Sequence, residues 1–164
     1  MNSDKLKENL FIIQDWIKSA DQKVSIWFAF EGIFLTFIMG YFFDFLPSLF
    51  EKGLPFQIIF ALLISSILVL IGFSAYKSIC VIFPRIKNNG KKSLLYFGDI
   101  GKMTKKEFNY RLKNYSEKDY RKDLISQIYI SSSIAIKKHR NFRDSIICFV
   151  IGFILLFVYF IIMI

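Results

Sequence analysis

One apolar stretch, residues 145–164, constrains this chain more than any other feature, because none of its twenty residues is charged. Uncharged apolar runs of about eighteen residues or more suit a bilayer better than a soluble core. Two further predominantly apolar stretches lie at residues 24–46 and 55–83. We therefore expect an all-α membrane protein with three transmembrane helices.

The composition agrees with this class and limits what else the chain contains. Hydrophobic residues make up 54% of its 164 residues, which exceeds the share in ordinary soluble domains. The three spans use nearly half of the chain, so the remainder is too short for two further domains. We expect a single domain, residues 1–164, in which helix extensions form a small cytosolic bundle.

Basic residues are distributed unevenly around the spans. Residues 84–144 hold sixteen Lys and Arg residues against six acidic residues, whereas the linker at 47–55 holds one Lys. Because positively charged segments stay in the cytoplasm, we expect the N-terminus and residues 84–144 to be cytoplasmic. Topology and anionic lipids account for the net charge of +9, so nucleic acid is not an expected partner.

Residues 1–23 are expected to form a cytosolic helix that continues into the first span. Their apolar residues repeat every three or four positions and form one stripe: Leu6, Leu10, Ile13, Ile17, Ala20 and Val24. No Pro or Gly separates this stripe from the span. A helix lying flat on the membrane surface is the alternative, but balanced charges favour a bundle.

The segment 84–144 is expected to contain a loop, a short helix and a stalk. Pro84 ends the second span, and residues 94–100 read as a short apolar patch in an extended conformation. The loop ends at a capping box formed by Thr104 and Glu107, which predicts a helix to about residue 113.

A second helix start is expected at Ser116, with Asp119 in the position of the usual Glu. No helix breaker follows before Gly152. This pattern predicts one helix of more than forty residues, which begins as the cytosolic stalk and continues into the span at 145–164.

Glu31 is the most suggestive single residue, since it lies about eight positions into the first span, roughly 12 Å along a helix axis. An ionised carboxylate is costly in hydrocarbon, and intramembrane acids are functional candidates. Glu31 could line a pore, pair between subunits or remain protonated. If the membrane begins near Phe28, Glu31 is merely interfacial.

Features of an enzyme are missing from the sequence. The single His and the two Cys residues show no metal-ligand spacing. No nucleophile–base pair is recognisable either. We expect no catalytic residue, no metal, no cofactor and no enzymatic activity.

Residues 96–99 combine two aromatic rings, a glycine and an acid within a loop. Such a group could stack a nucleotide base and accept a hydrogen bond from it. Aromatic packing beneath a loop is the alternative.

Several stretches resemble the Pycsar membrane-effector (PycTM-type) domain. They are residues 16–23 (WIKSADQK), 96–100 (YFGDI) and 107–108 (EF), together with the stalk pattern of Asp119, Tyr120, residues 127–129 (QIY) and Lys137. The likeness covers nearly the whole chain. A related architecture occurs in SLATT-type membrane effectors of bacterial conflict systems, which are the alternative family.

The resemblance implies an antiphage effector of the bacterial inner membrane. In such systems a partner nucleotide cyclase makes a nucleotide second messenger during infection, and the effector then damages the membrane, an outcome termed abortive infection. A cyclic nucleotide or related messenger is the implied ligand. The lipid bilayer is a direct partner, and a homo-oligomer is expected because three spans cannot enclose a pore. A non-catalytic adaptor without a nucleotide response is the alternative function.

Eight residues are candidates for nucleotide binding because they lie in the resembling stretches. They are Trp16, Asp21, Lys23, Tyr96, Asp99, Tyr120, Gln127 and Lys137.

Overall fold

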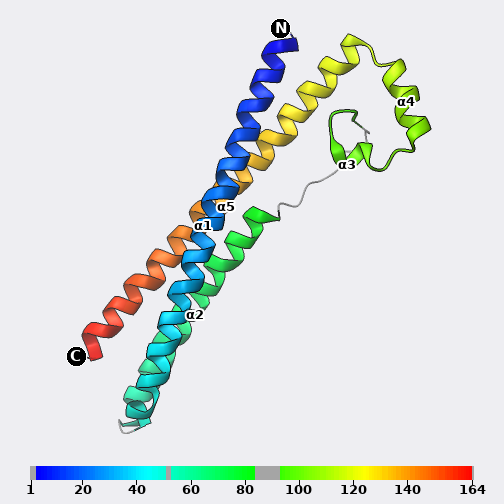
Figure 1. Cartoon of the computed structure of the whole chain (residues 1–164). Helices are drawn as coiled ribbons and strands as arrows, with labels where there is room; N and C mark the ends of the chain where they lie inside the picture. The colour runs from blue at the N-terminus through cyan, green and yellow to red at the C-terminus, as the bar shows by residue number, and fades with distance from the viewer. Residues whose placement is uncertain (1–2, 51–52, 84–92, 164) are drawn as a thin grey trace. The chain divides into compact units, whose positions relative to one another are not determined.

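The computed structural model describes residues 3–50, 53–83 and 93–163, and every regular element in these ranges is a helix. The helices are α1 (Ser3–Phe50), α2 (Leu54–Ile82), α3 (Phe97–Ile100), α4 (Lys105–Lys113) and α5 (Glu117–Met163), as Figure 1 shows. Helices α1, α2 and α5 are long and apolar enough to cross a membrane. The predicted all-α membrane fold is therefore confirmed.

The chain divides into two compact units. We call residues 20–83 and 138–164 the membrane unit, and residues 1–19 and 84–137 the polar unit. Helix α1, of 48 residues, and helix α5, of 47 residues, each contribute to both units. Both helices are continuous at Lys23 and Asp144. This continuity was predicted from the absence of helix-breaking residues at these positions. The span limits at 24–46, 55–83 and 145–164 stay predictions, because helix bounds do not mark a membrane boundary.

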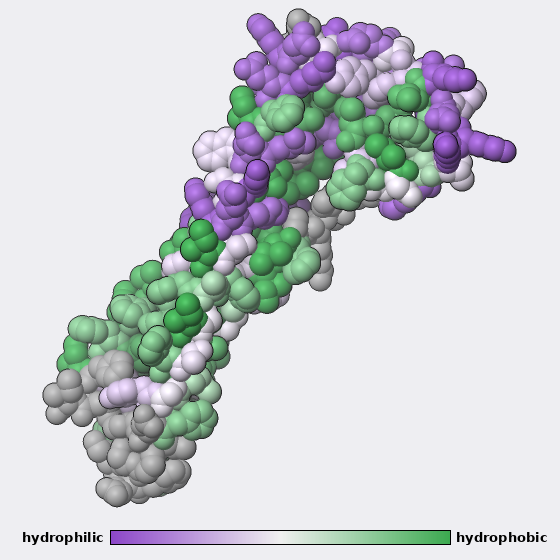
Figure 2. Space-filling model, in the orientation of Figure 1, coloured by the Kyte–Doolittle hydropathy of each residue, from purple (hydrophilic) through white to green (hydrophobic). Residues whose placement is uncertain are grey.

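The core of the membrane unit is apolar. Its buried members come from α2 and α5, and partly buried residues of α1 pack against them: Phe60, Ile67, Ile71, Leu156 and Tyr159, with Phe34, Ile38 and Phe42 of α1. Many outward-facing side chains of this unit are also large and hydrophobic, and its surface is largely hydrophobic in Figure 2. A helical unit that is hydrophobic all round suits a lipid environment.

Gly152 allows α5 to approach α2 closely. A Cβ atom at Gly152 would lie 3.4 Å from Cβ of Leu70 and 3.6 Å from Cγ1 of Ile71. Small residues at such positions let membrane helices pack backbone to backbone. The glycine that stands within the third apolar stretch is therefore a packing residue and does not interrupt the helix.

The polar unit contains the predicted helix starts. The Thr104 side chain accepts a hydrogen bond from the Glu107 backbone N–H at 3.2 Å, which caps α4. The Ser116 side chain accepts a hydrogen bond from the Asp119 backbone N–H, also at 3.2 Å, at the start of α5. Both capping predictions are confirmed.

The first turns of α1 contact the first turns of α5 within the polar unit. Ser3 Oγ hydrogen-bonds with the Glu117 carboxylate, and Lys7 Nζ lies 5.5 Å from the ring centre of Tyr120. Leu6 and Leu124 are each 2% exposed. Leu6, the first residue of the predicted apolar stripe, is therefore buried. The polar unit is therefore a packed helical module.

Helix α1 continues through Pro47 to Phe50, so the start of the linker at 47–55 is helical; a proline weakens a helix without always ending it, and membrane helices tolerate it. One expectation about local structure was wrong. Residues 97–100 form the single helical turn α3 and are not extended; the Tyr96 carbonyl accepts hydrogen bonds from Asp99 and Ile100, each at 3.0 Å. The expected helix stop at Pro84 lies outside the described residues.

Candidate functional site

Glu31 is buried in the interior of the membrane unit, with 3% of its surface exposed. It lies on the face of α1 that also carries Ala20 and Val24, both fully buried. The apolar stripe that began in the polar unit thus continues through Glu31, since these positions are spaced by about one or two helical turns. The α1 face that carries the apolar stripe therefore also places the Glu31 carboxyl inside the membrane unit.

Three serines and a tryptophan surround the Glu31 carboxyl. Trp27 Nε1 donates to Oε1 at 3.0 Å, Ser145 Oγ donates to Oε1 at 3.3 Å, and Ser78 Oγ donates to Oε2 at 3.2 Å. Ser74 Oγ also hydrogen-bonds with Oε1. We call these five residues the Glu31 cluster. Every long helix contributes to it: α1 supplies Trp27 and Glu31, α2 supplies two serines, and α5 supplies one.

The serine hydroxyls of the Glu31 cluster also contact one another. Ser145 Oγ lies 2.9 Å from both Ser74 Oγ and Ser78 Oγ, and Ser74 Oγ hydrogen-bonds with the Ser145 backbone carbonyl at 2.8 Å. Trp27 Nε1 donates to Ser145 Oγ as well, at 3.0 Å. All three serines are fully buried. The network therefore joins the three helices through side chains that have no access to solvent.

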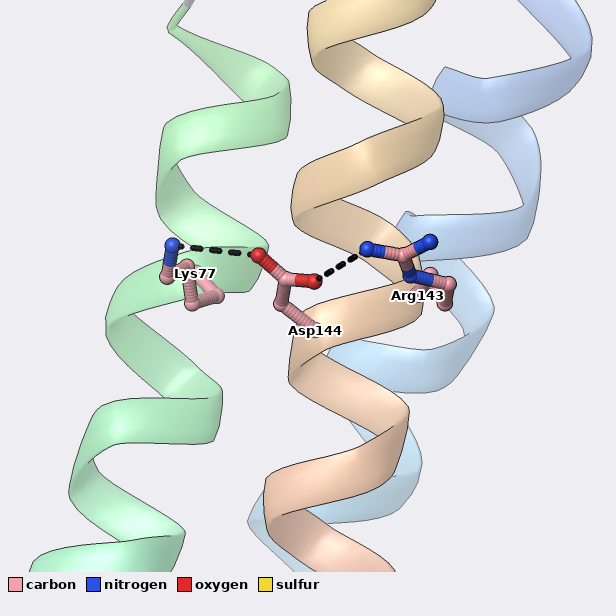
Figure 3. A network of polar contacts seen from close by, with 3 residues as sticks. All are labelled: Lys77, Arg143 and Asp144. Atoms are coloured by element: carbon pink, nitrogen blue, oxygen red, sulfur yellow. Dashed lines mark hydrogen bonds and ion pairs between the residues drawn. The ribbon is translucent and has the colours of Figure 1, made fainter.

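An ion-paired group lies directly beside the Glu31 cluster along α2 and α5. Asp144 accepts hydrogen bonds from Lys77 Nζ at 3.4 Å and from an Arg143 guanidinium nitrogen at 3.2 Å, one on each carboxylate oxygen (Figure 3). Lys77 immediately precedes Ser78, and Asp144 immediately precedes Ser145. The charges next to the cluster thus satisfy one another and leave Glu31 to the serines and Trp27.

A second buried charge joins α1 to α5. The Lys138 side chain is 5% exposed and forms an ion pair with the Asp21 carboxylate, whose side chain is 43% exposed. Buried lysines are rare unless they are paired. Asp21, a nucleotide-binding candidate, is therefore engaged with another residue of the membrane unit.

Aromatic rings pack between α1 and α5 next to the cluster. The ring of Phe149 lies 5.1 Å from that of Trp27, 5.6 Å from that of Phe30 and 5.0 Å from that of Phe34, measured between ring centres. Phe34 also contacts Phe153, at 5.6 Å. These edge and tilted contacts stabilise aromatic pairs beyond simple burial. They hold the Trp27 N–H toward the cluster.

A different polar network organises the polar unit around Asp123. This carboxylate accepts hydrogen bonds from Tyr115 at 2.7 Å, from the Ser93 hydroxyl at 3.1 Å and from the Leu94 backbone N–H at 3.2 Å. Ser93 also donates its backbone N–H to Asp99 at 3.0 Å. Burial, together with the hydrogen bond to Asp123, raises the pKa of Tyr115 above its ordinary value. The network ties the start of the loop to α5.

The nucleotide-binding candidates do not all fall in one unit. Asp21 and Lys23 belong to the membrane unit, and the other six belong to the polar unit: Trp16, Tyr96, Asp99, Tyr120, Gln127 and Lys137. Trp16 and Lys137 are exposed, whereas Asp99 is 5% exposed. The Asp99 carboxylate accepts a backbone hydrogen bond, so it supports the loop locally. Their role in binding stays a prediction.

Tyr96 is held by its own loop. Its ring packs on Gly98, where a Cβ atom would lie 2.6 Å from the Tyr96 ring, and its ring centre lies 5.0 Å from that of Phe97. Phe97 is 80% exposed. The glycine of the motif therefore makes room for the tyrosine ring, and the exposed ring is the phenylalanine.

The sequence singled out Glu31 but not the residues that bind it. Ser74 and Ser78 are one helical turn apart, and this spacing was the only available signal that both face the same side of α2. Lys138 was not among the candidate residues either. Within the described ranges, no three His, Cys, Asp or Glu residues are grouped as metal ligands.

The long apolar helices and the buried cluster define a membrane protein with a compact polar helical unit. The family model of the Pycsar effector protein domain (PycTM) matches residues 5–164, so the chain belongs to the Pycsar effector family of antiphage defence. The resemblance seen in the sequence is thus confirmed. No curated protein and no solved structure matches the chain.

Proposed function

We propose that this chain senses a nucleotide second messenger in the cytosol and then rearranges or oligomerises, which impairs the integrity of the bacterial inner membrane. The family match over residues 5–164 carries this proposal, because Pycsar effectors act in antiphage defence. The messenger is a cyclic nucleotide or a related molecule made by a partner nucleotide cyclase. The membrane damage stops the infected cell before phage are released.

The continuity of α1 and α5 supports the proposed mechanism. Each is one uninterrupted helix that contributes to both units. A helix without a break transmits a displacement that a flexible linker would absorb. Binding in the polar unit then shifts the membrane unit, provided that the ligand binds the altered arrangement more tightly than the resting one.

The polar unit offers groups that suit a nucleotide. Trp16 is 56% exposed and presents an indole ring on which a base can stack. The exposed Lys137 supplies a cation for phosphate. Tyr96, Asp99, Tyr120 and Gln127 complete the candidate site, and Asp21 and Lys23 stay candidates on the helix that they share with Trp16.

Self-association is supported by an outward face of α1. Gly32, Thr36 and Gly40 repeat every four residues on this face and are exposed, and nothing lies within 4 Å of a Cβ atom built at either glycine. Small residues at this spacing let membrane helices of neighbouring subunits approach closely. We propose this face as a subunit contact of the active assembly.

The direct test reconstitutes the full chain in vesicles of bacterial polar lipids filled with a self-quenched dye. Cyclic mononucleotides carrying each of the RNA bases are added one at a time. Dye release with at least one nucleotide supports the proposal. No release with any of them, combined with no loss of membrane potential in cells that also express a cognate cyclase, would overturn it in favour of the adaptor.

A matched pair of variants tests the binding residues. Trp16→Ala should raise the nucleotide concentration needed for half-maximal release by roughly tenfold or more, because stacking of a base on an aromatic ring contributes about 1–3 kcal/mol. Phe11→Ala is the control, since Phe11 is a similarly exposed aromatic residue of α1 outside the resembling stretch. Equal effects of the two substitutions would contradict a specific role for Trp16.

A further inference from the structure

The hydrogen atoms available around Ser74 do not suffice for an ionised Glu31. Ser74 Oγ carries one hydrogen but hydrogen-bonds with two acceptors, Glu31 Oε1 and the Ser145 backbone carbonyl oxygen at 2.8 Å. A carbonyl oxygen can only accept. With Glu31 ionised, the two acceptors would have to share the single Ser74 hydrogen, in a site where an incompletely satisfied polar group is costly.

A proton on Glu31 resolves the shortage. The carboxylic acid then donates from Oε1 to Ser74 Oγ, and Ser74 donates onward to the Ser145 carbonyl. Ser78 Oγ still donates to Oε2, at 3.2 Å, and Trp27 Nε1 still donates to Oε1. Each of these donors then has an acceptor.

No cation compensates a negative charge on Glu31 in the described part of the chain. Its contacts are those with the other members of the Glu31 cluster, none of which is charged. The titratable and charged groups nearest to the cluster along the packed helices are Lys23 on α1, Lys77 and Cys80 on α2, and His139, Arg143, Asp144 and Cys148 on α5. Lys77 and Arg143 are both engaged with Asp144. An unpaired buried carboxylate would be strongly unfavourable.

We infer that Glu31 is a proton-binding site that closes the resting membrane unit: the neutral acid binds Ser74, Ser78 and Ser145 across three helices, and separation of the helices releases its proton to water. This inference deepens the proposed function. Only one consequence, that opening makes the membrane leak, rests on the proposed function. The step is a simple dissociation, in which the O–H bond of the acid breaks and water accepts the proton.

The direction of the pH effect follows from linkage. Opening releases one proton in the proposed step. By mass action a higher pH therefore favours the open unit, by up to about tenfold per pH unit for one proton. The same reasoning makes acid pH hold the unit closed.

Infrared spectroscopy tests the protonation directly and does not depend on membrane damage. The full chain in vesicles at neutral pH should show the carbonyl stretch of a protonated carboxylic acid, and Glu31→Gln should abolish it. Ser74→Ala should move this band to higher frequency, because the acid loses its acceptor; this variant keeps the test usable if Glu31→Gln does not fold. Absence of the band from the native chain would overturn the inference.

Fluorescence of Trp27 tests the coupling to helix separation. In a Trp16→Phe background Trp27 is the only tryptophan, and its quenching by aqueous acrylamide should increase as the pH is raised. Glu31→Gln should remove this pH dependence, because an amide can donate to Ser74 at every pH. The same pH dependence in both chains would overturn the proton-linked closure.

Dye release distinguishes this inference from the proposed function. If Trp27 quenching depends on pH through Glu31 while the vesicles stay tight with every nucleotide, the proton site stands and the membrane-damaging function fails. If release responds to a nucleotide but the acid band is absent, the function stands and the proton site fails.

Discussion

Lys138 of α5 and Asp21 of α1 form an ion pair in which the lysine is almost completely buried and the aspartate is about half exposed. This asymmetry predicts unequal effects of removing either partner. Asp21→Ala should lower the free energy of unfolding by about 3 kcal/mol, because it leaves a buried charge unpaired. Lys138→Met should cost only about 1 kcal/mol, because the remaining carboxylate reaches solvent.

Thermal unfolding in detergent micelles measures this difference, with Lys137→Met as the control. Lys137 is adjacent in sequence but exposed, so its substitution should be neutral. Equal losses for Asp21→Ala and Lys138→Met would contradict the unequal burial of the pair.

Ser145 contacts every other member of the Glu31 cluster. Ser145→Ala removes a hydroxyl that serves three helices and should lower the free energy of unfolding by roughly 1–3 kcal/mol. Ser133→Ala, at a half-buried position of the same helix, should have little effect. Tryptophan fluorescence during unfolding would follow the loss, since Trp27 belongs to the cluster; a neutral Ser145→Ala would show that the network contributes nothing.

Gly152 and Gly72 offer a matched test of helix approach in the membrane unit. A side chain at Gly152 meets Leu70 and Ile71, whereas nothing lies within 4 Å of a Cβ atom at Gly72. Gly152→Leu should therefore destabilise the packing of α5 on α2 by about 1–3 kcal/mol through overpacking. Gly72→Leu should cause no loss. Chemical denaturation in micelles measures both, and a reversed order would refute the close approach of the two helices.

The raised pKa of Tyr115 predicts that the polar unit loses stability at alkaline pH. Its pKa is raised above the ordinary 10.0 by burial and by the hydrogen bond to Asp123. The folded state thus holds the phenol proton more tightly than the unfolded chain does. The resulting stability is fully present below pH 10 and is lost as the pH rises from there toward the higher folded-state pKa.

Unfolding midpoints measured from neutral to strongly alkaline pH would show this loss. Tyr115→Phe should be less stable than the native chain at neutral pH, and the difference should shrink above pH 10. A difference that stays constant over this range would mean that the Tyr115 phenol is not held by Asp123.

Local signals in the sequence were sufficient for most of the secondary structure. The caps at Thr104 and Ser116 located the starts of α4 and α5 within a residue, because a side chain that caps a helix acts on its own neighbours. The same local reasoning failed at residues 97–100. The sequence Phe-Gly-Asp-Ile suits a helical turn as well as an extended strand, and the hydrogen bonds from Asp99 and Ile100 to the Tyr96 carbonyl decide between the two.

The candidate functional site was predictable only in part. A lone carboxylate within an apolar stretch stands out in the sequence, and Glu31 was found for that reason. Serines are common in membrane helices, so Ser74, Ser78 and Ser145 carried no comparable signal. The candidate Asp21 likewise gave no indication that Lys138, more than one hundred positions away, would be its partner.

The sequence by itself determined that this protein is helical and that its long helices suit a membrane, because hydrophobicity and helix signals depend on residues close together in the chain. Only the tertiary structure decided what Glu31 does there. Three hydroxyls separated by 43, 47 and 114 positions from Glu31 meet its carboxyl because α1, α2 and α5 pack face to face. Which serines face inward depends on the rotation of each helix against the others, and no local pattern specifies it.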